Sequence, residues 1–410
     1  MEILEILKII NLIPLMKKLL ILNDKLFIMR INNKLDEIVY YLINLKPKEK
    51  TGLFTGSAGI ALFLFYYSRY SRYKQNGSIA DNAMEFLSHS VSEIDNDLYH
   101  TFCDGISGIC WSIQHLIANG FIDNDNAEIL EPFDRYLCDQ VAYHSSIGNF
   151  DFLHGATGTA FYLLKRINNP LVRQTTEDMV NRLFHYKNEE NSKYFWKSKF
   201  GNDINICLSH GISSICIYLC KVFGVSINKT ISYDLLRKSI SFLLSQENNS
   251  KERKSMFPTF NKDAISLNSR LGWCYGDLGI GMALWHYANA FNDNLMKEKS
   301  LDIFEFSSKR KDLTESFVID AGICHGSAGI ASIFKKMYYY TGLEEFKNIA
   351  LYWLEQTLLM SKHEDGIIGY KSDEKDKSTD LLSGIAGIGL VLLSFLTGEE
   401  TNWDECLLLS

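Results

Sequence analysis

The chain has 410 residues, of which 46% are hydrophobic and 22% are charged, and its formal net charge is −7. This composition is typical of a globular protein, and the acidic balance argues against nucleic-acid binding, which needs a basic surface. The nine cysteines, an odd number without a secretory signal, favour a reducing cytoplasm over a disulfide framework. The presence of only five prolines favours long helices over a loop-rich β fold.

The N-terminal stretch 1–29 is apolar, but charged residues such as Glu5, Lys8 and Lys17 interrupt it, so it holds no run of about 18 apolar residues. It also lacks the basic start and the small-residue cleavage site of a signal peptide. We therefore expect residues 1–45 to be a helical extension that packs on the body of the protein. Two alternatives stay open: contact with a membrane surface, and a true start at Met16 or Met29.

One pattern, G-x-x-G followed by apolar residues, recurs seven times along the chain. Ser214 stands in the fourth copy where the other copies have their second glycine. Successive copies are 49 to 65 residues apart, and their first glycines are Gly56, Gly105, Gly155, Gly211, Gly276, Gly326 and Gly384.

Each copy opens a nearly all-apolar stretch, which predicts a helix that is buried on every side. Between the copies lie amphipathic stretches, for example Phe346, Ile349 and Trp353 at helical spacing. Such a helix pair cannot bury its inner helix alone, and the last copy (382–393) is too apolar to cap an open solenoid. We therefore predict an all-α fold, a seven-repeat α/α toroid of inner and outer helices. Residues 46–410 would form this single domain, with short excursions at 192–203, 221–234 and 246–270.

The positions just before each first glycine predict a site. If the inner helices start at one end of a ring, these residues face a shared central space. Capping accounts for Thr55, Asp104 and Ser383 there, but not for three histidines and a tyrosine at equivalent places. The full set is Thr55, Asp104, His154, His210, Tyr275, His325 and Ser383.

Two neighbouring copies offer ligands for a metal. The fifth copy supplies Cys274, and the sixth supplies Cys324 and His325. Three protein ligands with one open position are typical of catalytic zinc, and a helix N-terminus favours the thiolate form. The alternatives are that these are small buried residues at a tight helix start, or that the analogous set Cys103, Asp104 and His154 binds the metal, which we treat as the weaker candidate. We expect Cys110, Cys138, Cys207, Cys216, Cys220 and Cys406 to be buried thiols.

The motifs "GWCYGDLG", "ICHGSAGI" and "LSHGIS", with the G-x-x-G copies over residues 50–395, resemble the lanthionine synthetase C-like proteins, the cyclases of lanthipeptide (lantibiotic) biosynthesis. The family fold is a seven-repeat α/α toroid. The resemblance implies that Cys274, Cys324 and His325 bind Zn²⁺. It also implies active-site positions at His210, Arg270, Tyr275 and Asp151.

The activity that the resemblance implies is a Michael-type addition. A cysteine thiolate of a dehydrated precursor peptide adds to dehydroalanine or dehydrobutyrine and forms a lanthionine or methyllanthionine thioether ring. His210 would be the acid or base, and Asp151 would orient it, although Asp104 competes for that place. Arg270 and Tyr275 would stabilise the enolate, or would serve only in ion pairing and packing.

The implied setting is cytoplasmic, with a dehydratase and an exporter as partners in a complex and at most peripheral membrane association. Two alternatives keep the toroid: a prenyltransferase-like zinc enzyme that acts on thiols, and a glutathione-binding or peptide-binding member of the same superfamily. The prenyltransferase class uses an Asp, Cys and His ligand set, which the C-Y-G and C-H-G motifs disfavour. A glycosidase is disfavoured because no paired carboxylates stand at the helix starts.

Overall fold

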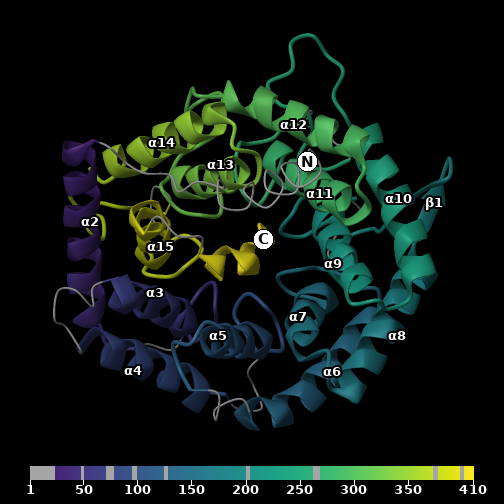
Figure 1. Cartoon of the computed structure of the whole chain (residues 1–410), viewed down its shortest axis with the longest axis horizontal. Coiled ribbons are helices and arrows are strands. Elements are labelled where there is room, and N and C mark those ends of the chain that lie inside the picture. Colours follow the sequence, from purple (N-terminus) through teal and green to yellow (C-terminus); the bar gives the residue numbers. More distant parts are fainter. Residues whose placement is uncertain are drawn as a thin grey trace, which may run out of the picture.

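The computed structural model describes residues 24–47, 50–70, 78–94, 99–123, 128–199, 204–261, 268–372, 377–397 and 401–410. Two concentric rings of helices make up this part of the chain (Figure 1). The inner ring consists of α3 (Ser57–Tyr70), α5 (Ile106–Ala118), α7 (Ala156–Leu163), α9 (Ile212–Gly224), α11 (Asp277–Phe291), α13 (Ser327–Thr341) and α15 (Ile385–Leu396). The outer ring consists of α2 (Lys25–Ile43), α4 (Ser78–Ser92), α6 (Glu131–Ser146), α8 (Pro170–Tyr186), α10 (Lys229–Ser245), α12 (Asn294–Ser308) and α14 (Glu344–Leu359).

The inner helices begin directly after the first glycines, as the repeats predict. Their burial is nearly continuous; in α15 every residue from Ile385 to Phe395 is buried. The outer helices bury one face only, and in α14 the buried residues include the predicted Phe346, Ile349 and Trp353. Because α15 packs against both α3 and α13, the ring closes and the α/α toroid is confirmed.

Residues 25–43, which we expected within an N-terminal extension, form α2 in the outer ring. The helix packs on α14 and α15, and the Arg30 guanidinium lies 2.8 Å from the Glu355 carboxylate. The more apolar segment before it, residues 1–23, lies outside the described residues, and the domain boundary after residue 45 stays a prediction. Within the described ranges, no helix combines the length and the apolarity needed to cross a membrane.

The inner-helix starts are tied together by a circle of backbone hydrogen bonds, which we call the rim. It runs through the residue two places before each first glycine: Phe54, Cys103, Leu153, Ser209, Cys274, Cys324 and Leu382. At six of the seven junctions, the amide of this residue donates to the carbonyl of the equivalent residue in the next repeat, with N···O distances of 2.8 to 3.4 Å. The seventh junction, between Leu153 and Ser209, has no such bond although both residues are described. The bonds are Phe54 to Cys103, Cys103 to Leu153, Ser209 to Cys274, Cys274 to Cys324, Cys324 to Leu382 and Leu382 to Phe54.

In five of the seven copies, the second glycine allows the loop before the helix to lie close to the start of that helix. A Cβ atom at Gly158 would come within 1.9 Å of the Phe152 carbonyl oxygen, so a larger residue would displace the loop. In the fourth copy Ser214 occupies this place, and its hydroxyl donates to the Gly211 carbonyl at 2.8 Å.

The predicted excursion at 221–234 is wrong, because α9 runs to Gly224 and α10 begins at Lys229, which leaves only a short turn between two helices.

A small β hairpin leads into the predicted excursion at 192–203. Strands β1 (Asn188–Glu190) and β2 (Lys193–Phe195) pair antiparallel, with Asn188 opposite Phe195. The following Trp196 donates its indole N–H to the Leu183 carbonyl at 3.0 Å, which fixes the segment after β2 against α8.

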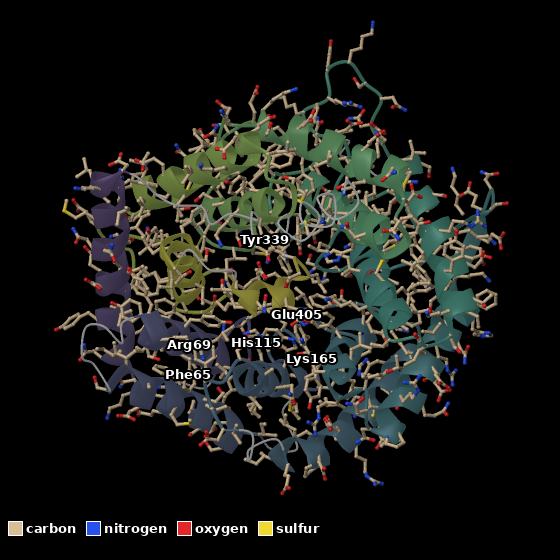
Figure 2. The ribbon with its side chains drawn as sticks, viewed as in Figure 1. Phe65, Arg69, His115, Lys165, Tyr339 and Glu405 are labelled. Carbon is tan, nitrogen blue, oxygen red and sulfur yellow. The ribbon has the colours of Figure 1, made fainter. Side chains whose placement is uncertain are left out.

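The C-terminal segment fills the centre of the ring, an arrangement that the sequence does not predict (Figure 1). It contains the 3-10 helix η5 (Asn402–Leu407). The Asp404 carboxylate lies 2.7 Å from the Lys336 ammonium of α13, and both side chains are buried. Lys165, just after α7, pairs with Glu405 near the middle of the ring (Figure 2). The Trp273 indole donates to the Leu407 carbonyl at 2.8 Å, so the segment reaches close to the rim.

The Lys336–Asp404 pair yields a stability prediction. Replacing Asp404→Ala removes the carboxylate from a lysine side chain that is only 3% exposed, and this should lower the free energy of unfolding by about 3–5 kcal/mol. Chemical denaturation measures the loss. The matched control is Lys347→Ala, which breaks an ion pair with the exposed Glu344 and should leave the denaturation midpoint unchanged. Equal stability of both variants would contradict a structural role for the C-terminal segment.

Candidate metal centre and active site

The residues just before the first glycines behave as the lining of a shared space. All seven are partly exposed, whereas the residues around them are mostly buried. Their side chains therefore reach open space at the end of the ring where the rim joins the inner helices. Every predicted site residue lies on a rim loop: Asp151, His210, Arg270, Cys274, Tyr275, Cys324 and His325.

The two predicted cysteine ligands meet between the fifth and sixth repeats. The Cys274 amide donates to the Cys324 carbonyl at 3.0 Å, and a Cβ atom at Gly272 would lie 3.1 Å from the His325 Cα. A hydrogen bond from the Cys324 thiol lowers the pKa of Cys274, and the charges of His325 and Arg270 lower it further. The same hydrogen bond, with burial, raises the pKa of Cys324. One thiolate is thus favoured at this junction.

The third predicted ligand, His325, is oriented by an aspartate that the sequence analysis did not identify. Asp320 Oδ2 lies 2.7 Å from His325 Nδ1, and Asp320 Oδ1 accepts the Gly322 amide at 2.7 Å. The hydrogen bond to Asp320 raises the pKa of His325 against the effect of burial. This leaves Nε2 as the ligand atom, an arrangement common among metal-binding histidines. Alignment of the repeats could have pointed to Asp320, because Asn149 and Asn205 hold the equivalent place and accept similar turn hydrogen bonds.

The three residues of the alternative ligand set lie closer together in the structure than the three predicted zinc ligands. Among the described residues, one group of three potential metal ligands has all its ligand atoms within 4.8 Å of one another, and it is Cys103, Asp104 and His154. Cys274, Cys324 and His325 are not packed this tightly as a set. The contacts between their loops bring the three together, but the assignment of these residues as ligands stays a prediction.

The loop that carries Cys274 and Tyr275 needs a glycine at its end. Gly276 has φ +86°, a conformation that residues with a side chain rarely adopt. The first glycines of five other copies have φ between −108° and −137°. A Cβ atom at Gly276 would come within 2.6 Å of the Arg270 carbonyl oxygen. The fifth loop therefore follows its own path to the site.

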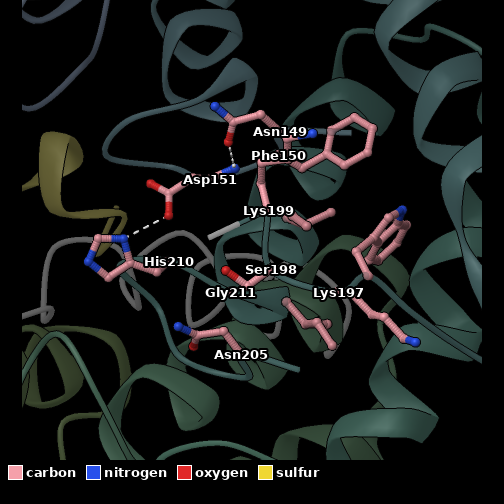
Figure 3. A pocket seen from close by; sticks show the side chains of 12 residues that line it. Asn149, Phe150, Asp151, Lys197, Ser198, Lys199, Asn205, His210 and Gly211 are labelled. Carbon is pink, nitrogen blue, oxygen red and sulfur yellow. Dashed lines mark hydrogen bonds and ion pairs between the residues drawn. The ribbon is translucent and has the colours of Figure 1, made fainter. Parts of the chain in front are cut away.

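The predicted histidine and aspartate of the active site form a pair across the junction that lacks a rim bond. His210 Nδ1 lies 2.7 Å from Asp151 Oδ2 (Figure 3). Asp104 accepts a hydrogen bond from Thr101 instead. Burial alone would lower the pKa of His210, but the hydrogen bond and charge of Asp151, with a contribution from Cys274, raise it. The pair thus joins the third and fourth repeats and leaves His210 Nε2 available.

Aromatic and charged side chains surround this pair. The Tyr275 ring lies 6.4 Å from the His210 ring, and the His154 ring lies 5.9 Å from the His210 ring. Burial and nearby thiols raise the pKa of Tyr275, so its hydroxyl stays a neutral donor at physiological pH. The charge of Arg270 lowers the pKa values of Cys274, Cys324 and His325, so this guanidinium lies within electrostatic range of the predicted ligands.

A cleft opens beside Asp151 and His210. It is lined by Trp196, Lys197, Ser198 and Lys199 after β2, and by Asn205 and residues at the start of α9 (Figure 3). The excursion after β2 thus forms one wall of the cleft. The second excursion is also anchored near the site, because the buried Asp277 accepts the amides of Met256 and Phe257 and pairs with Arg310 at 3.0 Å.

The Asp151–His210 pair yields a pH prediction. Replacing Asp151→Asn should drop the pKa of His210 from above its ordinary value of 6.5 to below it, because burial then dominates. In the wild type the pair stabilises the fold fully below pH 6.5, and this contribution is lost as the pH rises through the raised pKa. An NMR titration of the histidine ring measures the shift. Asp36→Asn, which removes a partner of Tyr67, is the control, and an unchanged His210 pKa in Asp151→Asn would contradict the pairing.

Comparison with known proteins agrees with the fold and with the sequence motifs. The family model "Lanthionine synthetase C-like protein" matches residues 47–408. The nisin biosynthesis protein NisC of Lactococcus lactis subsp. lactis is 25% identical over 402 residues, which cover 87% of this chain and 88% of NisC. A solved structure of nisin cyclase has a TM-score of 0.74 at 22% identity, covering 92% of this chain and 97% of its own. Because the family model spans most of the chain, this protein belongs to the lanthionine synthetase C-like family.

Proposed function

We propose that this protein is a zinc-dependent lanthipeptide cyclase, which adds a cysteine thiolate of a precursor peptide to a dehydroalanine or dehydrobutyrine of the same peptide. The observation that carries the proposal is the arrangement of the rim. One junction bears two cysteines and an Asp-oriented histidine, and a nearby junction bears an Asp–His pair. The relatives named nisin cyclase and nisin biosynthesis protein support the same activity.

The donor set at the fifth and sixth repeats fits zinc. Two thiol sulfurs and one imidazole suit zinc better than magnesium or calcium, which prefer oxygen ligands. Asp320 fixes the His325 ring, and the lowered pKa of Cys274 favours the thiolate that a metal ligand needs. A zinc ion held by Cys274, Cys324 and His325 would supply the positive charge that keeps a peptide thiol deprotonated near neutral pH.

His210 is the proposed acid in the addition. The peptide sulfur forms a bond to the β-carbon, the π electrons move toward the carbonyl as an enolate, and a proton must then reach the α-carbon. The raised pKa of His210 keeps its ring protonated over a wider pH range, and Asp151 at Nδ1 directs Nε2 toward the central space. The proton taken up by the α-carbon balances the one lost by the thiol.

Arg270 and Tyr275 are the proposed stabilisers of the enolate. The guanidinium carries a fixed positive charge, and the protonated phenol is a hydrogen-bond donor close to His210. Both groups come from the same loop as Cys274, so the developing negative charge would form between them and the Asp–His pair.

The substrate and partners follow from the proposed activity. The substrate is a precursor peptide whose serines and threonines have already been dehydrated, and a dehydratase and an exporter are its proposed partners. A cytoplasmic location, with membrane association only through such a complex, belongs to the same proposal.

The ligand assignment predicts the result of one substitution. Cys274→Ala should lose one equivalent of zinc per chain and abolish ring closure, since only one sulfur ligand remains at that junction. Metal analysis, together with thiol consumption in a dehydrated precursor, measures both effects. The matched control is Cys216→Ala, which alters a thiol buried within α9 and should keep both metal and activity. Full zinc content and ring closure in Cys274→Ala would contradict the assignment.

The proposed acid predicts a different pattern. His210→Asn keeps a polar group beside Asp151, so zinc content should stay unchanged while cyclisation slows by about 10²–10⁴-fold. Single-turnover kinetics with a dehydrated precursor measure the rate. His185→Asn, at an exposed histidine near the end of α8, serves as the control. Wild-type rates in His210→Asn would remove this residue as the acid.

A further inference from the structure

A second cluster of metal-ligand side chains lies on the rim between the second and third repeats. The cluster consists of Cys103, Asp104 and His154, and one ligand atom from each lies within 4.8 Å of the other two. We propose that these three residues bind a divalent cation of the zinc class, at a site separate from Cys274, Cys324 and His325. The proposed cyclase chemistry does not require this site, and neither proposal depends on the other.

The repeats explain why a second site forms here. Cys103 holds the place of Cys274 and Cys324, two residues before a first glycine, and His154 holds the place of His325. The Cys103 amide donates to the Leu153 carbonyl at 3.0 Å, the same distance as in the bond between Cys274 and Cys324. Neighbouring loops are therefore joined alike at both junctions. The sulfur, nitrogen and oxygen donors that result are a ligand set that zinc accepts.

The Asp104 carboxylate is held in place beside Cys103. A thiol ligand loses its proton when it binds a cation. Thr101 donates a hydrogen bond to Asp104, which orients the carboxylate, and no ion pair with a described residue neutralises it.

A buried histidine lies three residues before Cys103 in the chain. His100 is 5% exposed, and its Nε2 has no hydrogen-bond partner within the described part of the chain. Its ring stacks on the His144 ring with centroids 3.9 Å apart, and burial, followed by the charge of His144, lowers the pKa of His100 to about 4, so it is neutral at physiological pH. An unpartnered buried imidazole nitrogen is costly in a folded protein. A cation bound at the cluster would give this neutral nitrogen a partner.

The site adjoins the proposed active site. The His154 amide donates to Asp151 Oδ1 at 2.8 Å, and the His154 ring lies 5.9 Å from the His210 ring. A cation bound through His154 would hold this loop next to the one junction where the rim lacks its backbone bond. Occupation of the site should therefore fix the loop that carries Asp151.

Metal stoichiometry tests the proposal on the full chain. The protein is saturated with Zn²⁺, freed of excess by gel filtration and analysed for zinc per chain. We expect two equivalents in the wild type and one each in Cys103→Ser, Asp104→Asn and His154→Gln. Asp104→Asn is nearly isosteric and tests the site if Cys103→Ser fails to fold, which circular dichroism reveals. Cys110→Ser, at a buried thiol of α5, is the control and should keep two equivalents.

The variants also separate the two sites. In the Co²⁺-substituted protein, Cys103→Ser should lower the thiolate-to-metal absorption by about one third, since one of three thiolate ligands is lost. A wild type that binds one equivalent in total, kept by Cys103→Ser and lost by Cys274→Ala, would overturn the second site and leave the proposed cyclase centre intact. A wild type that binds one equivalent in total, kept by Cys274→Ala and lost by Cys103→Ser, would support the site proposed here and contradict the other.

Discussion

The rim is the constraint on which the rest of this structure depends. Six backbone hydrogen bonds join loops that lie about 50 residues or more apart in the chain and hold the starts of the inner helices in one circle. Each loop then has a fixed path, so the residue before each first glycine reaches the central space whatever its chemistry. The repeats therefore carry a hydroxyl, a carboxylate, an imidazole or a phenol at this place on one fold.

The one open junction of the rim is joined by side chains instead. Asp151 and His210 form their pair between the third and fourth repeats, where Leu153 and Ser209 make no backbone bond. The same arrangement occurs within the sixth repeat, where Asp320 orients His325. In each pair a carboxylate binds Nδ1 and leaves Nε2 facing the site, in one pair for the proposed proton transfer and in the other for the proposed metal ligand.

The centre of the ring is closed by the C-terminal segment. This segment contacts Lys336 in α13 and Lys165 just after α7. It also contacts Trp273, one residue from the rim. The loops that bear the site therefore rest on a packed interior, while the segment after β2 forms one wall of the cleft beside Asp151 and His210.

The sequence by itself determined the seven repeats, the buried and amphipathic helices and the residues that reach the centre, because these follow from local periodicity and from glycine positions that recur along the chain. Closure into a toroid followed from the apolar last repeat. Only the tertiary structure decided which side chains meet: Asp320 with His325, Asp151 rather than Asp104 with His210, and Cys103, Asp104 and His154 as the most compact donor group. These pairings depend on how neighbouring loops approach one another to within an ångström, and residue spacing along one chain carries no such information.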